Sequence, residues 1–203
     1  LAALAFTAAI LIRLYNEVWS NTAVVGAYYG QSGEWTFIAS ALLFTAATLV
    51  YSIKGGLRSS IVTDVIQAVL FVFVLGVVLF LVLPKHGVGT LLGVGDFRLN
   101  AGVDLLLVAL LQVVSYPFHD PVLTDRGFIT REKPMLRAMI VAGVLGFLCI
   151  FAFSLVGVHA RLEGLPTGDN MPGAVALAFG TVPFLLMTVV MIMAAGSTLD
   201  STF

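Results

Sequence analysis

Between Ala68 and Leu83 the chain contains only apolar side chains and glycine, and no charged group. A helix rises about 1.5 Å per residue, so about 20 such residues cross the roughly 30 Å hydrocarbon core of a bilayer. The run does not alternate between apolar and polar residues, as the strands of a transmembrane barrel do. Six segments are long and apolar enough to span: residues 1–29, 35–53, 59–84, 102–127, 135–160 and 182–203. We predict an all-α, polytopic membrane helix bundle, with residues 1–203 forming one transmembrane domain.

The composition excludes the main soluble classes. Hydrophobic residues make up 60% of the chain and charged residues 10%, against about 25% charged in ordinary soluble domains. A soluble domain of this size leaves roughly a quarter to a third of its surface exposed, so it could not bury so much apolar area. The net charge of −1 implies no nucleic-acid partner. The lipid bilayer is the expected partner, and the single Cys149 cannot form an intrachain disulfide.

Glycine, proline and charged residues mark the connections between the spans. We predict a turn at 31–33, a tight cationic connection at 54–56, a longer glycine-rich loop at 85–100, and a short helix outside the membrane core at 172–179. Lys and Arg distribute unequally between the two sets of loops, which predicts orientation. The expected cytoplasmic set is Lys54, Arg58, Arg126, Arg131, Lys133 and Arg137, and the opposite set is Lys85, Arg98 and Arg161. A multi-pass protein of the plasma (inner) membrane is expected.

The two ends of the sequence resemble positions in the middle of a longer chain. Leu1 lies within an apolar stretch, and Phe203 follows small and hydroxyl residues without a charged flank. We expect an internal fragment of a longer polytopic protein.

Polar residues within spans are costly and are therefore site candidates. In the first span, Arg13 and Glu17 are four residues apart and can neutralise each other, with Asn21 one turn further along. This face either fixes helix packing or lines a polar path. In the third span, Asp64 lies about one and a half turns from the cytoplasmic end. It either attracts a cation to the inner mouth or is a solvated interfacial carboxylate.

The fourth span contains Pro117 and Pro121, which cannot both lie within an unbroken helix. We predict a break near 116–120 and a restart at 121, with Tyr116, His119 and Asp120 at the break. Transporters build substrate and ion sites from such breaks. The alternative is a proline kink whose carbonyls are satisfied by neighbouring helices.

In the sixth span, one helical face carries Ala194, Ser197, Thr198 and Ser201, at positions i, i+3, i+4 and i+7. Hydroxyls and nearby carbonyls are oxygen donors that suit a weakly held monovalent cation better than zinc, which prefers Cys and His. The alternative is that these hydroxyls bond back to carbonyls four residues earlier, as is common in membrane helices.

Two stretches resemble the sodium:solute symporter family. Residues 51–71 (YSIKGGLRSSIVTDVIQAVLF) are similar to its signature segment, and residues 193–201 (MAAGSTLDS) are similar to its second sodium-site helix. The resemblance covers essentially the whole chain. It implies a leucine-transporter-like core of five plus five helices in inverted repeats, of which this chain holds core helices three to eight. The remaining core helices of the same protein are then expected partners.

The resemblance also implies roles for individual residues. Ala194 would offer its carbonyl to Na⁺, Ser197 and Thr198 their hydroxyls, Asp64 would lie on the inner sodium route, and Tyr116 would gate the substrate. His119 and Asp120 follow that gate in place of the amide-rich stretch of many relatives. Val113 and Phe147 stand where sugar-transporting relatives have polar residues, which disfavours a sugar substrate.

The expected function is sodium-coupled symport of a small organic solute by alternating access, with Na⁺ as the coupling ion. The main alternative is a transporter-like sensor domain of a histidine kinase, since related membrane domains occur fused to such kinases. A channel is a further alternative. An intramembrane enzyme is not expected, because His119 and Asp120 lack an evident second carboxylate, metal set or nucleophile.

Overall fold

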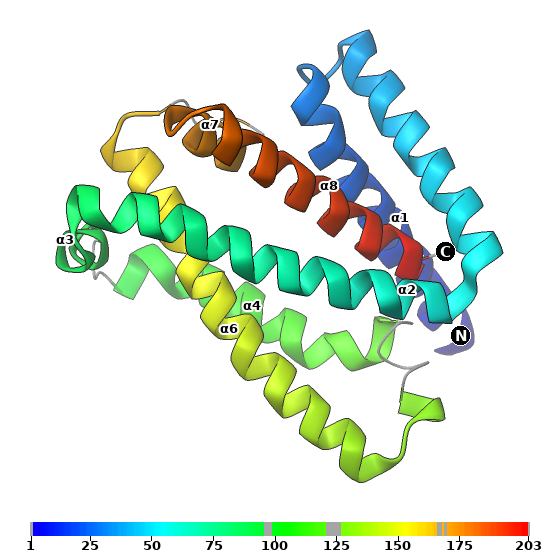
Figure 1. Ribbon diagram of the computed structural model, residues 1–203. Coiled ribbons are helices and arrows are strands. Elements are labelled where there is room, and N and C mark those ends of the chain that lie inside the picture. Colours follow the sequence, from blue (N-terminus) through cyan, green and yellow to red (C-terminus); the bar gives the residue numbers. More distant parts are fainter. Residues whose placement is uncertain (1, 96–98, 121–126, 166–167, 169, 203) are drawn as a thin grey trace.

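The computed structural model describes residues 2–95, 99–120, 127–165, 168 and 170–202; the side chains of residues 57–59, 99–101 and 117–119 lie outside this description (Figure 1). The described part consists of helices joined by short turns and contains no strand, which confirms the predicted all-α class. Its helices are α1 (Ala2–Tyr29), α2 (Trp35–His86), α3 (Val88–Gly93), α4 (Leu99–His119), α6 (Glu132–Leu162), α7 (Met171–Ala178) and α8 (Thr181–Thr202).

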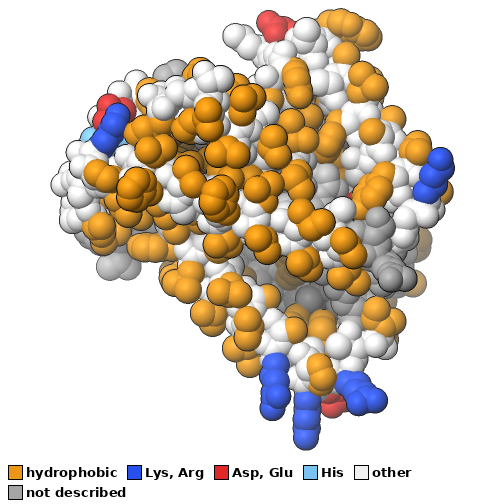
Figure 2. Space-filling model, viewed as in Figure 1, with side chains coloured by type: hydrophobic (Ala, Val, Ile, Leu, Met, Phe, Trp, Pro, Cys, Tyr) orange, Lys and Arg blue, Asp and Glu red, His pale blue; other side chains and the backbone are white. Residues whose placement is uncertain are grey.

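Five helical segments are long and apolar enough to cross a membrane, and they match five of the six predicted spans. They are Ala2–Tyr29, Trp35–Gly56, Ser60–His86, Glu132–Leu162 and Thr181–Thr202. In Figure 2 apolar side chains cover the middle of the visible face, while most Lys and Arg side chains gather at its lower and right edges. Lys54, Arg131, Lys133 and Arg137 are all exposed. These features indicate a multi-pass membrane protein.

Helix α2 contains two of these spans, joined by a sharp bend at Gly56. Gly56 has φ 59° and ψ −170°, and it is the residue inside α2 with non-helical dihedrals. This backbone region is essentially restricted to glycine. The tight connection predicted at 54–56 is therefore present, and the two spans of α2 diverge from it in different directions (Figure 1).

The polar end of the fourth predicted span is also the end of a helix. Helix α4 stops at His119, and the Asp120 amide donates to the Tyr116 carbonyl at 3.0 Å. The expected helical restart at 121 falls in residues 121–126, which lie outside the described residues. The apolar part of α4, Gly102–Tyr116, is shorter than the other spans.

The glycine-rich segment 85–100 is not the plain loop that its composition predicts. Gly87, with φ 73°, ends α2 by donating to the Leu83 carbonyl at 2.9 Å. The chain then forms α3, whose Leu91 is 2% exposed. Burial of this leucine in the core explains why a glycine-rich segment becomes helical, since tertiary packing outweighs weak helix propensity.

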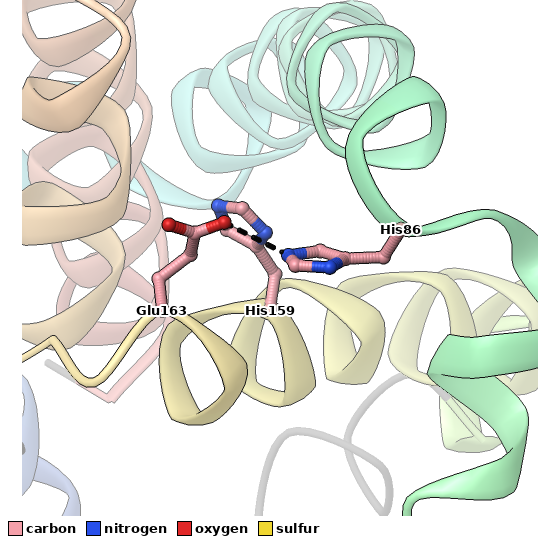
Figure 3. A group of neighbouring side chains, drawn as sticks. All are labelled: His86, His159 and Glu163. Carbon is pink, nitrogen blue, oxygen red and sulfur yellow. Dashed lines mark ion pairs between the residues drawn. The ribbon is translucent and has the colours of Figure 1, made fainter.

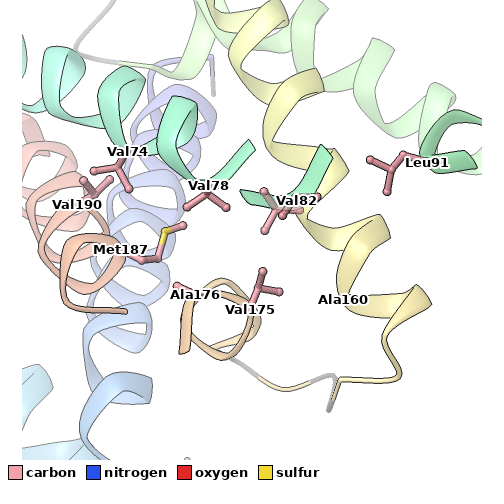
Figure 4. Close-up of a cluster of buried hydrophobic side chains, with 10 residues drawn as sticks. Val74, Val78, Val82, Leu91, Ala160, Val175, Ala176, Met187 and Val190 are labelled. Atoms are coloured by element: carbon pink, nitrogen blue, oxygen red, sulfur yellow. The ribbon is translucent and has the colours of Figure 1, made fainter. Parts of the chain in front are cut away.

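The buried core joins the second half of α2 to α6, α7 and α8 (Figure 4). Its ten members are Val74, Val78, Val82, Leu91, Val156, Ala160, Val175, Ala176, Met187 and Val190. The three α2 valines are four residues apart and so form one stripe on the helix.

Helix α7 confirms the short helix predicted at 172–179. Asn170 caps it by accepting from the Gly173 amide at 3.1 Å, and two α7 residues enter the core.

Helix α8 packs against α1, α2 and α7, so its two ends meet different partners. Its beginning contributes Met187 and Val190 to the core. Its end, which carries the predicted sodium-site residues, lies beside the bend of α2. This arrangement brings residues 51–71 and 193–201 together in space.

Candidate functional site

A cavity of about 220 Å³ lies between the two halves of α2 and the last turns of α8. Its volume is several times the roughly 30 Å³ that one water occupies in the liquid. Hydroxyl, amide and carboxylate groups interrupt an otherwise apolar lining. The lining residues are Phe44, Thr48, Tyr51, Thr63, Gln67, Ile192, Met193, Gly196, Ser197 and Asp200.

Asp200, in the last turn of α8, accepts several hydrogen bonds at this cavity. It is 8% exposed. Its Oδ1 accepts from Ser60 Oγ at 2.8 Å, and its Oδ2 accepts from Tyr51 OH at 3.1 Å and Thr63 Oγ1 at 3.2 Å. Hydroxyl donors therefore reach both carboxylate oxygens, as a buried carboxylate requires. The donors come from both sides of the α2 bend.

A second carboxylate, Asp64, meets α8 one turn earlier. Ser197 Oγ donates a hydrogen bond to Asp64 Oδ1. The Ser197 carbonyl accepts from Ser201 Oγ at 3.0 Å, and Ser201 Oγ lies 3.3 Å from Ser60 Oγ. A continuous set of oxygen groups thus links the Asp64 contact to the Asp200 contact.

The other two predicted sodium ligands bond to each other. Thr198 Oγ1 donates to the Ala194 carbonyl at 3.1 Å, which is the back-bonding arrangement that the sequence left open. Thr198 is exposed, whereas Ala194 and Ser197 are half-buried. Ser and Thr hydroxyls each have one proton and two acceptor lone pairs. The oxygens of Ser197 and Thr198 therefore keep lone pairs for a cation while their protons are engaged.

The polar residues of the first and fourth spans form one cluster instead of two. Arg13 pairs with Glu17, lies 3.7 Å from Asp120 Oδ2, and donates to Tyr116 OH at 3.1 Å. Its guanidinium also lies 5.3 Å from the centroid of the Tyr116 ring. Asn21 Nδ2 donates to the Glu17 carboxylate at 3.2 Å. The predicted gate residues Tyr116 and Asp120 are thus held by α1.

The side chain of His119, the third predicted gate residue, lies outside the described residues. Val113 and Phe147, which stand at the sugar-relative positions, are both exposed. Among the predicted site residues, the structure brings Asp64 into contact with Ser197. It also places Tyr116 and Asp120 together beside Arg13.

Sequence reasoning missed the central role of Asp200 and of its hydroxyl partners. A signal was present, because a carboxylate inside an apolar span is a default site candidate. Ser60 and Thr63 are three residues apart, so they share one face of α2. No local pattern indicates that this face and Tyr51 would meet the same carboxylate.

Apart from Arg13, every polar side chain described above offers oxygen. Carboxylate, hydroxyl and carbonyl oxygens suit hard cations and polar small molecules, whereas soft metals prefer sulfur and imidazole. No protein-family model, curated protein or solved structure matches this chain. The assignment of a function to this site therefore depends on its geometry and on the resemblance of two sequence stretches.

Proposed function

We propose that this protein is a sodium-coupled symporter that moves a small organic solute by alternating access. The observation that carries the proposal is the contact between Ser197 and Asp64. Each residue comes from one of the two stretches that resemble the sodium:solute symporter family. A chance likeness of two separate segments would not require their polar side chains to meet in space.

In the proposed site, Na⁺ is held by the Ala194 carbonyl and the hydroxyls of Ser197 and Thr198. Asp64 lies beside Ser197 and supplies a negative charge on the inward route of the ion. Each Na⁺ that enters down a membrane potential releases about 2.3 kcal/mol per 100 mV. That energy would drive solute accumulation if ion and solute move together.

The cluster of Arg13, Tyr116 and Asp120 is the proposed substrate end of the transport path. Its ion pairs hold the end of α4 against α1. A solute carrying a carboxylate or an amide could exchange with these contacts, whereas an apolar solute could not. This cluster fits the proposed inverted-repeat core, in which a broken helix forms the binding region.

The test is sodium-driven uptake of a panel of small solutes by the full-length protein in proteoliposomes. We expect Ser197→Ala and Thr198→Ala each to raise the half-saturating Na⁺ concentration several-fold, with little change in the half-saturating solute concentration. Thr188→Ala is the matched control, because Thr188 also back-bonds within α8, to the Phe184 carbonyl at 2.8 Å. Unchanged sodium affinity in both site variants would refute the assignment.

A further inference from the structure

A separate group of metal-ligand side chains lies where α2 and α6 end, outside the cavity described above (Figure 3). His86 is the last residue of α2, His159 lies in the last turn of α6, and Glu163 caps α6. His159 and Glu163 are four residues apart, so one face of the α6 end presents both side chains. The stick view shows all three side chains converging on the space between the two helices.

The three side chains are close enough to share one ion. One ligand atom from each residue lies within 4.8 Å of the other two. The imidazole rings of His86 and His159 have centroids 5.1 Å apart, and His86 Nε2 lies 3.0 Å from Glu163 Oε1. A tetrahedral ion with bonds of about 2.0–2.2 Å holds its ligand atoms about 3.3–3.6 Å apart, so the widest pair would have to close by up to about 1.5 Å, which side-chain rotation can supply.

Two imidazole nitrogens in this group are buried without a hydrogen bond to any described residue. They are His86 Nε2 and His159 Nδ1. His159 as a whole is only 1% exposed. His86 Nε2 lies close to Glu163 Oε1, but the contact lacks hydrogen-bond geometry. Buried polar atoms without partners are rare in folded proteins, and an ion is one of the few explanations for them.

We propose that His86, His159 and Glu163 bind a first-row transition-metal dication of the zinc class. Imidazole nitrogen and carboxylate oxygen are ligands of such ions, and two His with one Glu is a known zinc ligand set. Three protein ligands leave a fourth position for water. The bound ion would join the end of α2 to the end of α6.

The surroundings allow a cation to enter. The Glu163 side chain is 36% exposed, which gives a path from solvent. Lys85 precedes His86 in the chain, and its ammonium lies over the Phe179 ring at 4.7 Å from the ring centroid. Phe179 also stacks on His159 at 5.4 Å. The Glu163 carboxylate offsets the charge of Lys85 and attracts the dication.

The test measures metal binding directly and requires no transport activity. The purified full-length protein is stripped with a chelator and titrated with Zn²⁺, and Co²⁺ is added as a spectroscopic probe of tetrahedral coordination. We expect one Zn²⁺ per chain and visible Co²⁺ absorption typical of a four-coordinate site. Loss of outer-shell partners costs about 10–100-fold in metal affinity, so His86→Gln and Glu163→Gln, which remove ligands, should cost at least about 100-fold.

His119→Gln is the matched control, because it removes the remaining histidine of the three in the chain. It should keep wild-type zinc affinity. Glu163→Gln preserves the size of the side chain at a partly exposed position, so we expect this variant to fold. Circular dichroism before the titration checks its folding. Absence of stoichiometric Zn²⁺ binding by the wild-type protein would overturn the proposal. Equal zinc affinity in wild type, His86→Gln and Glu163→Gln would also overturn it.

Discussion

Tyr51 offers a test of how much the Asp200 contact contributes to folding. Its phenol donates to Asp200 Oδ2 at 3.1 Å and lies 3.1 Å from Thr63 Oγ1. Tyr51→Phe removes this hydroxyl and nothing else. Asp200 keeps Ser60 and Thr63 as donors, so the carboxylate remains partly satisfied.

The expected loss is about 1.5 kcal/mol. A hydrogen bond to a charged group contributes about 1.5–3 kcal/mol to stability. Side-chain hydrogen bonds measured within membrane proteins average about 0.6 kcal/mol and reach about 1.7. Asp200 is a charged, buried acceptor that keeps two other donors. The loss for Tyr51→Phe should therefore lie near 1.5 kcal/mol, where these two ranges of hydrogen-bond energy meet.

Tyr28→Phe is the matched control. The Tyr28 hydroxyl is buried and has no hydrogen-bond partner among the described residues, and its ring pairs with Phe184 at 6.4 Å. Removal of an unsatisfied buried hydroxyl should leave stability unchanged or raise it by up to about 1 kcal/mol, because the hydroxyl's desolvation cost disappears. The two variants carry the same chemical change, so they should differ by about 2 kcal/mol.

The assay is reversible unfolding by SDS in mixed micelles, followed by far-ultraviolet circular dichroism. Free energies extrapolated to zero SDS mole fraction are compared for wild type and both variants. A Tyr51→Phe stability within about 0.5 kcal/mol of wild type, the range of inconsequential substitutions, would refute the reasoning. So would a larger loss in Tyr28→Phe than in Tyr51→Phe.

The same unfolding assay tests three further substitutions. Gly56→Ala should destabilise by about 1–3 kcal/mol because alanine is strained at φ 59°, while Gly76→Ala, with open space around it, should gain up to about 1 kcal/mol. Gly26→Ala places a Cβ 2.8 Å from the Phe37 ring and should cost about 1–3 kcal/mol, and Phe37→Leu in the same chain should recover part of that loss. Arg13→Ala removes the cation that pairs with Glu17 and approaches Asp120 and should cost about 3 kcal/mol, with a smaller loss for the lysine variant.

The spans could be predicted from the sequence because length and apolarity are local properties. The bend at Gly56 could be predicted for the same reason, since a Lys-Gly-Gly stretch between two apolar runs is a local signal. Helix α3 could not be predicted, because it depends on Leu91 reaching a core built by other helices.

The site was predicted only in part, because its contacts join distant positions. Tyr51 and Asp200 are separated by 149 positions, and Arg13 and Tyr116 by 103. The sequence identified Asp64 and Ser197 separately, and only their resemblance to one family related them. For Thr198 the sequence left two arrangements open, since a hydroxyl in a helix can face an ion or its own backbone. The same limitation applies to His86, His159 and Glu163, whose convergence depends on how α2 and α6 pack.

The hydrogen bonds of Asp200 fasten both arms of the α2 bend to a third helix. Tyr51 precedes Gly56 in the chain, whereas Ser60 and Thr63 follow it, and all three donate to one carboxylate on α8. Gly56 alone cannot fix the angle between the arms, because glycine tolerates a wide range of backbone dihedrals. The angle therefore depends on Asp200 near the bend as well as on the valine core further along α2. Any event that neutralises the Asp200 carboxylate weakens all three attachments together, and it loosens the bend while the core still holds the far part of α2 against α8.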